Sequence, residues 1–283
     1  MYDRKESYCN IEKWRETGLD FEIRNHVAHL TLNRPHLRNA VSRDLRNSLL
    51  EALDYISLDP AIRAALVTGT GGAFSSGADL SQERVHDMPE EYERGTQVHR
   101  NREDGLRFGW WRLIEKVWTN TKPIVAAVTG PAYGFGCNFA FSADLVIAGE
   151  SARFCEIFVN RGLPLEAGGA YVLTRSISPV RARELAMFGE PLSGKRAEEW
   201  GLVNRCVPDE EVLALATEWA ERLASGPTIG IGHIKSQINM GLDQTIHQTW
   251  RDEVTYLGIG PGDDGMEAMT AFMERRQPRF TGR

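Results

Sequence analysis

Apolar residues recur with two different spacings along the chain, and the spacing changes from one segment to the next. Residues 21–35 predict two strands that reverse direction at Asn25. In the second of these strands alternate residues between positions 28 and 32 are apolar, which predicts one buried face. Pro35 ends the strand because proline cannot donate to a sheet ladder.

Residues 42–59 predict an amphipathic helix. Ser42 is a suitable N-cap, and the helix is expected to end before Pro60. Its apolar residues repeat at helical spacing, at Leu45, Leu49, Leu53 and Ile56.

Further strands are expected where short apolar runs alternate with helical stretches. These runs occupy residues 64–69, 123–128, 144–149 and 152–157, and a helix is expected over residues 179–190. Strands that alternate with helices in this way indicate an α/β core.

From residue 211 onward the pattern is helical only. Four helices are expected, over residues 211–225, 231–240, 244–259 and 264–276. Residues 1–19 show no sustained periodicity and are interpreted as an extension. The expected organisation is therefore an N-terminal extension at 1–19, an α/β core at 20–210 and a helical C-terminal region at 211–283.

Composition narrows the function classes. The chain has 283 residues, 42% of them hydrophobic and 25% charged, as is usual for a globular protein. The formal net charge of −6 argues against a general nucleic-acid surface, which needs a clustered basic excess. Four scattered cysteines indicate neither a zinc site nor a disulfide framework, so no metal is expected. No apolar run is long enough to span a membrane, and a cytoplasmic location is expected.

Two glycine-rich turns are the main candidates for chemistry: GAFSSGADL at 72–80 and GPAYGFGCN at 130–138. The second resembles half of a dinucleotide-binding GxGxxG, but its third glycine is missing and the pair stands away from the strand end. The first contains serine without the GxSxG of a nucleophile elbow. Neither motif therefore supports dinucleotide binding or a serine nucleophile.

Backbone amides are the remaining polar groups in these turns. Glycine lets the chain bend so that N–H groups point into a cavity, and a helix that starts there adds its positive end. Two such turns together can form an oxyanion hole. The alternative is that glycine serves only tight strand-to-helix connections.

Five segments together resemble the enoyl-CoA hydratase/isomerase family, the crotonase superfamily. They are LTLNRPHLRNAVS (30–42), GTGGAFSSGADL (69–80), KPIVAAVTGPAYGFGCNFAFSADLVIAG (122–149), EPLSGKRAEEWGLVNRCV (190–207) and DGMEAMTAFMERRQPRF (264–280). The resemblance implies a superhelix of ββα repeats with a helical C-terminal region that forms trimers, often a dimer of trimers. It also implies an acyl-CoA thioester substrate, with coenzyme A as part of that substrate and no separate cofactor.

In this family two main-chain amides bind the thioester oxygen, and by position they belong to Ala78 and Phe135. The resemblance also implies substrate-binding positions in the loop after the second strand and around both turns: Arg34, His36, Arg38, Ser76, Gly77, Asp79, Gly134, Gly136, Asn138 and Phe158. Arg276 or Arg279 could add charge from a neighbouring subunit. Asp79 is expected to cap or brace its turn.

The acid and base of the family's hydratases are replaced in this chain. Their two glutamates correspond to Asn138 and Phe158, neither of which can exchange a proton near neutral pH. Glu166 stands where several isomerases of the family carry a carboxylate, and it is the expected catalytic residue. The alternative is a carboxylate that favours a helix N-terminus. Glu156, two residues before Phe158, is interpreted as a solvated charge at the rim.

A single carboxylate favours double-bond isomerisation, because one group can remove a proton from one carbon and return it to another. A hydratase with an unusual acid/base set, a hydrolase or C–C lyase on a ring-bearing thioester, and a thioester binder without turnover remain alternatives. Aromatic residues Phe108, Trp110 and Trp111 suggest a bulky acyl group, with plain helix packing as the other interpretation.

Overall fold

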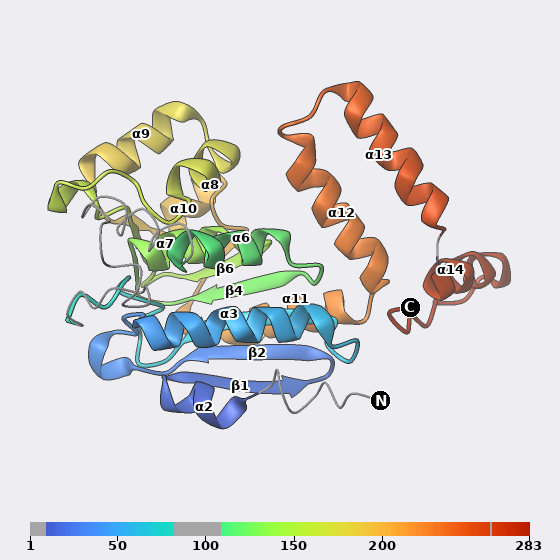
Figure 1. Cartoon of the computed structure of the whole chain (residues 1–283), viewed down its shortest axis with the longest axis horizontal. Coiled ribbons are helices and arrows are strands. Elements are labelled where there is room, and N and C mark those ends of the chain that lie inside the picture. Colours follow the sequence, from blue (N-terminus) through green and yellow to red (C-terminus); the bar gives the residue numbers. More distant parts are fainter. Residues whose placement is uncertain (1–9, 82–108, 261) are drawn as a thin grey trace, which may run out of the picture.

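The computed structural model describes residues 10–81, 109–260 and 262–283. A six-stranded sheet with the order β1-β2-β3-β4-β6-β9 forms its centre (Figure 1). Its strands are β1 (Leu19–Arg24), β2 (Val27–Leu32), β3 (Ala64–Gly69), β4 (Ile124–Val128), β6 (Leu145–Gly149) and β9 (Arg205–Val207). Only the first pair is antiparallel, and all later neighbours are parallel.

The hairpin predicted at the start of the chain is confirmed. β1 and β2 pair from Leu19 opposite Leu32 to Arg24 opposite Val27. Asn25 and His26 form the turn with φ of 48° and 64°, the positive values that a two-residue hairpin loop requires.

Both faces of the sheet are buried, which explains why β4 is apolar at every position. Ile124, Ala126 and Val128 belong to the larger core cluster, whereas Val125 and Ala127 belong to a cluster on the opposite face. Strands of a parallel sheet that are covered on both sides are expected to be continuously apolar.

Helices cover these two faces. On the first face lie α3 (Arg43–Leu58), α6 (Trp111–Thr119) and α7 (Phe135–Phe141). On the other lies α11 (Asp209–Ala224), which packs on β3, β4 and β6. The Ser42 side chain accepts a hydrogen bond from the Leu45 amide, so the predicted N-cap is confirmed.

A second, smaller sheet consists of β5 (Pro131–Tyr133), β7 (Arg153–Cys155) and β8 (Leu192–Ser193). Isolated bridges join Ser75 to Ala132 and Val41 to Ala78, so the loops after β2 and β3 run beside this sheet. In the large sheet, β2 and β3 are thus each followed by a short extended segment and, further along the chain, by an α-helix. This succession is the predicted winding of ββα units.

The fold begins earlier than the boundary predicted at residue 20. Helix α2 (Ile11–Glu16) precedes β1, and Trp14 in it is fully buried against Phe21 and Tyr55. The Trp14 indole also donates to Glu51 at 2.9 Å. The interpretation of residues 11–19 as an extension is therefore corrected, because Trp14 and the Thr17 hydroxyl, which donates to Ser48 Oγ at 3.0 Å, tie this segment to the core.

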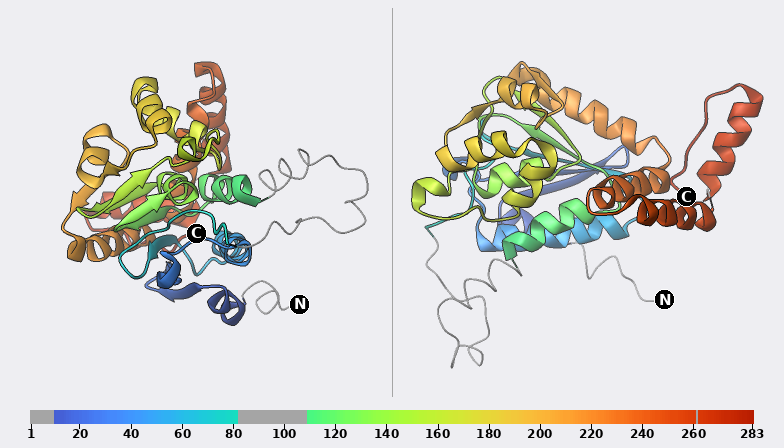
Figure 2. Two further views of the ribbon diagram at one scale, coloured as in Figure 1. Left: turned by 90° about the vertical axis from the view of Figure 1, so that its left-hand side faces the viewer. Right: turned by 90° about the horizontal axis from the view of Figure 1, so that it is seen from above.

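The remaining elements of the described residues are all helical. They are η1 (Pro35–Leu37), η3 (Val159–Arg161), α8 (Gly169–Ser176), α9 (Pro179–Phe188), α10 (Gly194–Trp200), α12 (Thr228–Gly241), α13 (Ile246–Ile259) and α14 (Gly262–Glu274). The last three helices extend away from the sheet, as Figure 2 shows from two further sides. The predicted helical C-terminal region is thus present.

Candidate active site

The two glycine-rich turns lie against each other. The Tyr133 amide donates to the Ser75 carbonyl at 2.9 Å, and the Ser75 amide donates to the Pro131 carbonyl at 3.0 Å. A β-carbon added at Gly77 would lie 2.7 Å from the Tyr133 oxygen and 3.7 Å from the Phe135 nitrogen. Gly77 also has a φ of 98°, so glycine is needed there both for its conformation and for this close approach.

Two amides at this junction have no acceptor within the described part of the chain. In the first turn, the Gly77 amide donates to Ser75 Oγ and the Asp79 amide to the Val41 carbonyl, whereas the Ala78 amide between them has no such partner. In the second turn, Phe135 is the first residue of α7, where an N–H has no partner within the helix. Both predicted donors are therefore available for a ligand oxygen.

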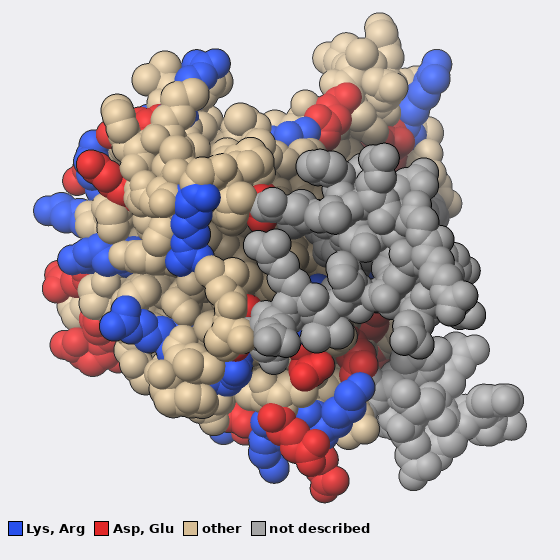
Figure 3. Space-filling view, turned by 60° about the vertical axis from the view of Figure 1, so that its left-hand side comes forward, with Lys and Arg blue, Asp and Glu red and all other residues tan. Residues whose placement is uncertain are grey.

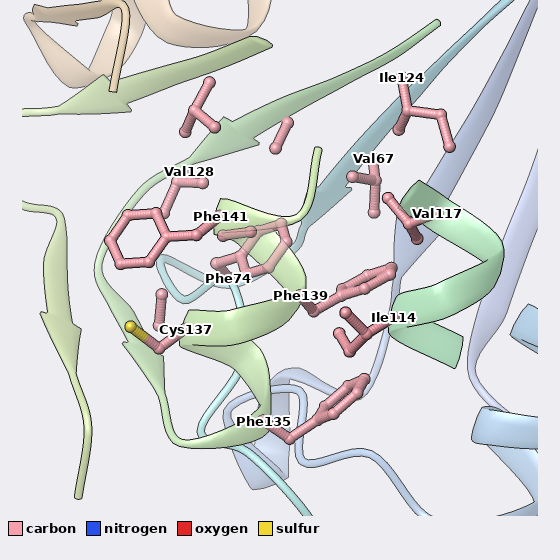
Figure 4. Close-up of a cluster of buried hydrophobic side chains, with 14 of the residues drawn as sticks. Val67, Phe74, Ile114, Val117, Ile124, Val128, Phe135, Cys137, Phe139 and Phe141 are labelled. Atoms are coloured by element: carbon pink, nitrogen blue, oxygen red, sulfur yellow. The ribbon is translucent and has the colours of Figure 1, made fainter. Parts of the chain in front are cut away.

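The Phe135 ring points away from this junction into the core. It is 3% exposed and stacks on Phe139, with ring centroids 5.5 Å apart. Figure 4 shows both rings directed toward Ile114 of α6, with Cys137 on the opposite side of α7. The side chain thus anchors the start of the helix while leaving the amide available.

Arg34 braces the first turn. Its Nη1 donates to the Ala40 carbonyl at 2.6 Å and to Asp79 Oδ2 at 3.0 Å. Asp79 Oδ1 accepts from the Ser81 hydroxyl and amide, and these bonds with the Arg34 charge hold the pKa of Asp79 below its usual value. The predicted bracing role of Asp79 is confirmed, and Arg34 shares in it.

The other predicted positions of this loop differ in exposure. His36 and Arg38 are exposed, and Ser76 is fixed by bonds from its amide to the Arg38 carbonyl and from its hydroxyl to the Leu37 carbonyl. Gly134 and Gly136 are buried within the second turn. Arg276 pairs with Glu267 and Glu274 of its own chain.

Glu166 lies on a turn that the second glycine-rich segment supports directly. Asn138 Nδ2, one helical turn after Phe135 in α7, donates to the Glu166 carbonyl at 3.0 Å. The next two residues, Ala167 and Gly168, have positive φ of 48° and 73° before α8 begins. Alanine rarely adopts this conformation, so the turn stores strain of the kind found at functional sites.

Glu156 is not a solvated rim charge, and that interpretation is wrong. β7 ends at Cys155, and the following Glu156 turns inward with 0% exposure. Burial raises the pKa of Glu156 to about 8, against smaller lowering effects of the Cys137 thiol and the Asn138 amide. The sequence gives no sign of this depth, because the burial depends on α7, which packs against Glu156 only in the folded chain.

Aromatic side chains surround the second turn. Phe158 is 9% exposed, and its ring lies 3.6 Å from the position of a β-carbon on Gly134. The Trp110 ring centroid is 4.7 Å from that of Phe135, and Trp111 packs edge-on against Tyr171. Phe108 lies outside the described residues. Position 158, where the family's hydratases are expected to carry a glutamate, therefore holds an apolar side chain beside the second turn.

Comparison with known proteins agrees with this arrangement. The sequence model described as enoyl-CoA hydratase/isomerase matches residues 22–283. The chain belongs to the enoyl-CoA hydratase/isomerase family. It is 34% identical over 258 residues to the 1,2-epoxyphenylacetyl-CoA isomerase of Escherichia coli, covering 91% of this chain and 95% of that one. It is also 34% identical to a probable enoyl-CoA hydratase of Rhodobacter capsulatus, over 93% of this chain and 97% of the relative.

Solved structures show the same fold for this member of the enoyl-CoA hydratase/isomerase family. A putative enoyl-CoA hydratase from Streptomyces coelicolor superimposes with a TM-score of 0.86 at 29% identity, over 100% of both chains. An enoyl-CoA hydratase from Bacillus anthracis superimposes with a TM-score of 0.83 at 29% identity, over 94% of this chain and 100% of that one. The protein is therefore an enzyme with the crotonase fold.

The surface in Figure 3 carries acidic and basic side chains side by side on the face shown. Within the described ranges, none of the helices combines the length and apolarity needed to cross a bilayer. The same part of the chain contains no group of three or more His, Cys, Asp or Glu side chains placed to hold a metal ion.

Proposed function

We propose that this enzyme moves a double bond within an acyl-CoA thioester and uses Glu166 as its single proton carrier. The observation that carries the proposal is the link between Asn138 and the Glu166 turn. It holds the turn of Glu166, the position where several isomerases of the family are expected to carry a carboxylate, against the helix that begins with Phe135, while Asn138 and Phe158 stand at the positions of the two hydratase glutamates.

In the proposed reaction Glu166 removes a proton from the carbon beside the thioester carbonyl of a 3-enoyl-CoA. The electron pair left on that carbon moves into the carbonyl, and the resulting enolate oxygen accepts hydrogen bonds from the Ala78 and Phe135 amides. Protonated Glu166 then returns the proton to the far end of the conjugated system, and the double bond shifts by one position. Preorganised N–H donors stabilise such an oxyanion, and each is worth roughly a hundredfold in rate or more.

The proposed chemistry needs no cofactor, because no electrons leave the substrate and no group is transferred to another molecule. The Phe158 ring, which lies beside Gly134 in the turn that carries the Phe135 amide, supports a bulky or ring-bearing acyl group.

Isomerisation in heavy water tests this function. Straight-chain and ring-bearing 2-enoyl and 3-enoyl-CoA thioesters are incubated with the enzyme and followed by mass spectrometry. We expect a product thioester with deuterium bound to carbon and its double bond shifted by one position. Its mass should not include that of an added water. Addition of water would instead support a hydratase with an unusual acid/base set. Thioester binding without any turnover would support a binder and contradict the proposal.

Self-association of this chain is part of the proposal. The three C-terminal helices expose apolar stripes at helical spacing, and α13 carries Ile246, Trp250, Val254 and Leu257 on one side with exposures of 49–80%. Large exposed apolar areas of this kind mark interaction surfaces. α12 and α14 also expose several large apolar side chains. The partner proposed for these surfaces is a second copy of the chain, in the trimer or dimer of trimers expected for the family.

Light scattering measures this association directly. We expect a trimeric or hexameric mass for the protein and a lower mass for Trp250→Glu, because a charge in an apolar contact is costly to bury. Thr255→Glu is the matched control, since Thr255 is exposed on the same helix away from the stripe. A monomeric wild-type protein, or equal masses for both variants, would contradict the proposed contact.

A further inference from the structure

The buried carboxyl group of Glu156 has no role in the proton transfer described above. It lies between the end of β7 and the inner side of α7, where the Cys137 thiol and the Asn138 amide contact it. None of the groups that influence its ionisation is a cation. A carboxylate buried without a positive partner is costly, so a group in this position keeps its proton.

The hydrogen bonds around Glu156 and Asn138 are incomplete in a specific way. Asn138 Nδ2 approaches Glu156 Oε2 at 3.4 Å, while Asn138 Oδ1 and Glu156 Oε1 are both buried without a partner in the described residues. A carboxylic acid and an amide can form two antiparallel hydrogen bonds, one from the amide N–H and one from the acid O–H. The two unpartnered atoms are the pair that would complete this ring.

We propose that Glu156 is a protonated positioning residue that pairs with the Asn138 amide through two hydrogen bonds, so that Asn138 holds the main-chain carbonyl of Glu166. This role rests on the proposed function of Glu166. With its oxygen engaged by the acid, the Asn138 amide cannot rotate, and its N–H remains directed at the Glu166 carbonyl, 3.0 Å away.

The turn that carries Glu166 needs such a support. Ala167 adopts a φ of 48°, a conformation that is strained for alanine and persists only where surrounding contacts enforce it. Gly169 leaves room for the Asn138 amide, because a β-carbon there would lie 2.7 Å from Asn138 Nδ2. Release of Asn138 would let the turn relax and move the Glu166 carboxylate from the reacting carbon.

Ionisation of Glu156 would break the pair, since a carboxylate cannot donate to Asn138 Oδ1. The pKa of about 8 places this event at mildly alkaline pH. The titratable groups that face Glu156 are the Cys137 and Cys155 thiols, whose pKa values are both raised by burial and by Glu156 itself.

The pH profile of kcat for Glu156→Gln tests the pair. Glutamine accepts from Asn138 Nδ2 and donates to Asn138 Oδ1 at every pH. We expect the wild-type kcat to fall as the pH rises through about 8 and the Glu156→Gln kcat to stay level there. Glu156→Ala, which removes both bonds, should lower kcat by about tenfold to a hundredfold at every pH, because small misplacements of a catalytic group have effects of this size.

Cys137→Ala is the matched control, because it removes the neighbouring thiol and leaves the carboxyl group in place. It should retain the alkaline fall of kcat but move it to a higher pH, because the thiol lowers the pKa of Glu156. An alkaline fall that persists in Glu156→Gln, or one that disappears in Cys137→Ala, would overturn the assignment.

A measurement without turnover separates this inference from the proposed function. The folded protein keeps the Glu156 proton up to pH about 8, whereas the unfolded chain loses it near the ordinary value of 4.5. The contribution of Glu156 to stability is therefore fully present below pH 4.5 and is lost as the pH rises from there to about 8. We expect the melting temperature of wild type to fall across this window relative to that of Glu156→Gln. A constant difference between the two would exclude a protonated Glu156, whatever reaction the enzyme performs.

Discussion

Replacement of Glu166 by glutamine is expected to lower double-bond migration by roughly a hundredfold to ten-thousandfold, the range attributed to a general acid–base group. The substitution keeps the size of the side chain and removes only its ability to take and return a proton. Deuterium uptake from heavy water should fall by the same factor, because both readouts depend on the same proton transfer. Thioester binding should change little, since the two amide donors and the turn are retained.

The control for this prediction is Glu199→Gln, a substitution of the same kind at an exposed position of α10. It should leave turnover unchanged. Equal turnover for wild type and Glu166→Gln on the true substrate would remove Glu166 from the reaction and leave the proton carrier to be sought elsewhere. Isothermal titration with a non-reacting thioester distinguishes a loss of chemistry from a loss of binding.

Replacement of Lys235 by methionine is expected to destabilise the protein by about 3–5 kcal/mol, the usual cost of leaving a buried charge without its partner. Lys235 lies on α12, is 8% exposed, and donates to Asp144 Oδ2 at 2.8 Å and to the Val117 carbonyl at 2.8 Å. It thus joins the C-terminal helices to the loop before β6 and to α6. Urea unfolding of the two proteins measures the difference.

The double substitution Lys235→Met with Asp144→Asn is the informative companion. Burial raises the pKa of Asp144 and lowers that of Lys235, although each ion favours the charged form of the other, so desolvation outweighs their attraction. Removal of both charges should therefore lower the free energy of unfolding by clearly less than removal of Lys235 alone. If the double variant is less stable than Lys235→Met alone, the loss of stability comes from packing and the prediction fails.

Local signals in the sequence identified most of the large sheet and its helices. The β1–β2 hairpin follows from alternation around Asn25, and α3 follows from the Ser42 cap and a leucine repeat. The glycine turns were also recognisable, because Gly77 is needed for a local conformation that sequence reasoning can anticipate. These features depend on residues within a few positions of one another.

Features that depend on distant partners were misjudged or missed. Trp14 precedes any periodic segment, and its burial depends on Tyr55 and Glu51 of α3. Glu156 follows a strand of three residues, too short to fix which way its side chain turns. Its depth depends on α7, which lies against it only in the folded chain. Acidic residues are usually exposed, so sequence alone favoured the wrong environment.

Both proposed donors to the oxyanion are main-chain amides, and this affects which substitutions the site can accept. At positions 78 and 135 every amino acid except proline supplies the same N–H group, so substitutions there can reshape the neighbourhood of the substrate without deleting the donor. Phe135 shows that such a position can hold a large side chain, because its ring packs in the core while its amide stays in the turn. Substitutions at these positions can therefore change which acyl group fits while both proposed donors to the enolate oxygen are kept.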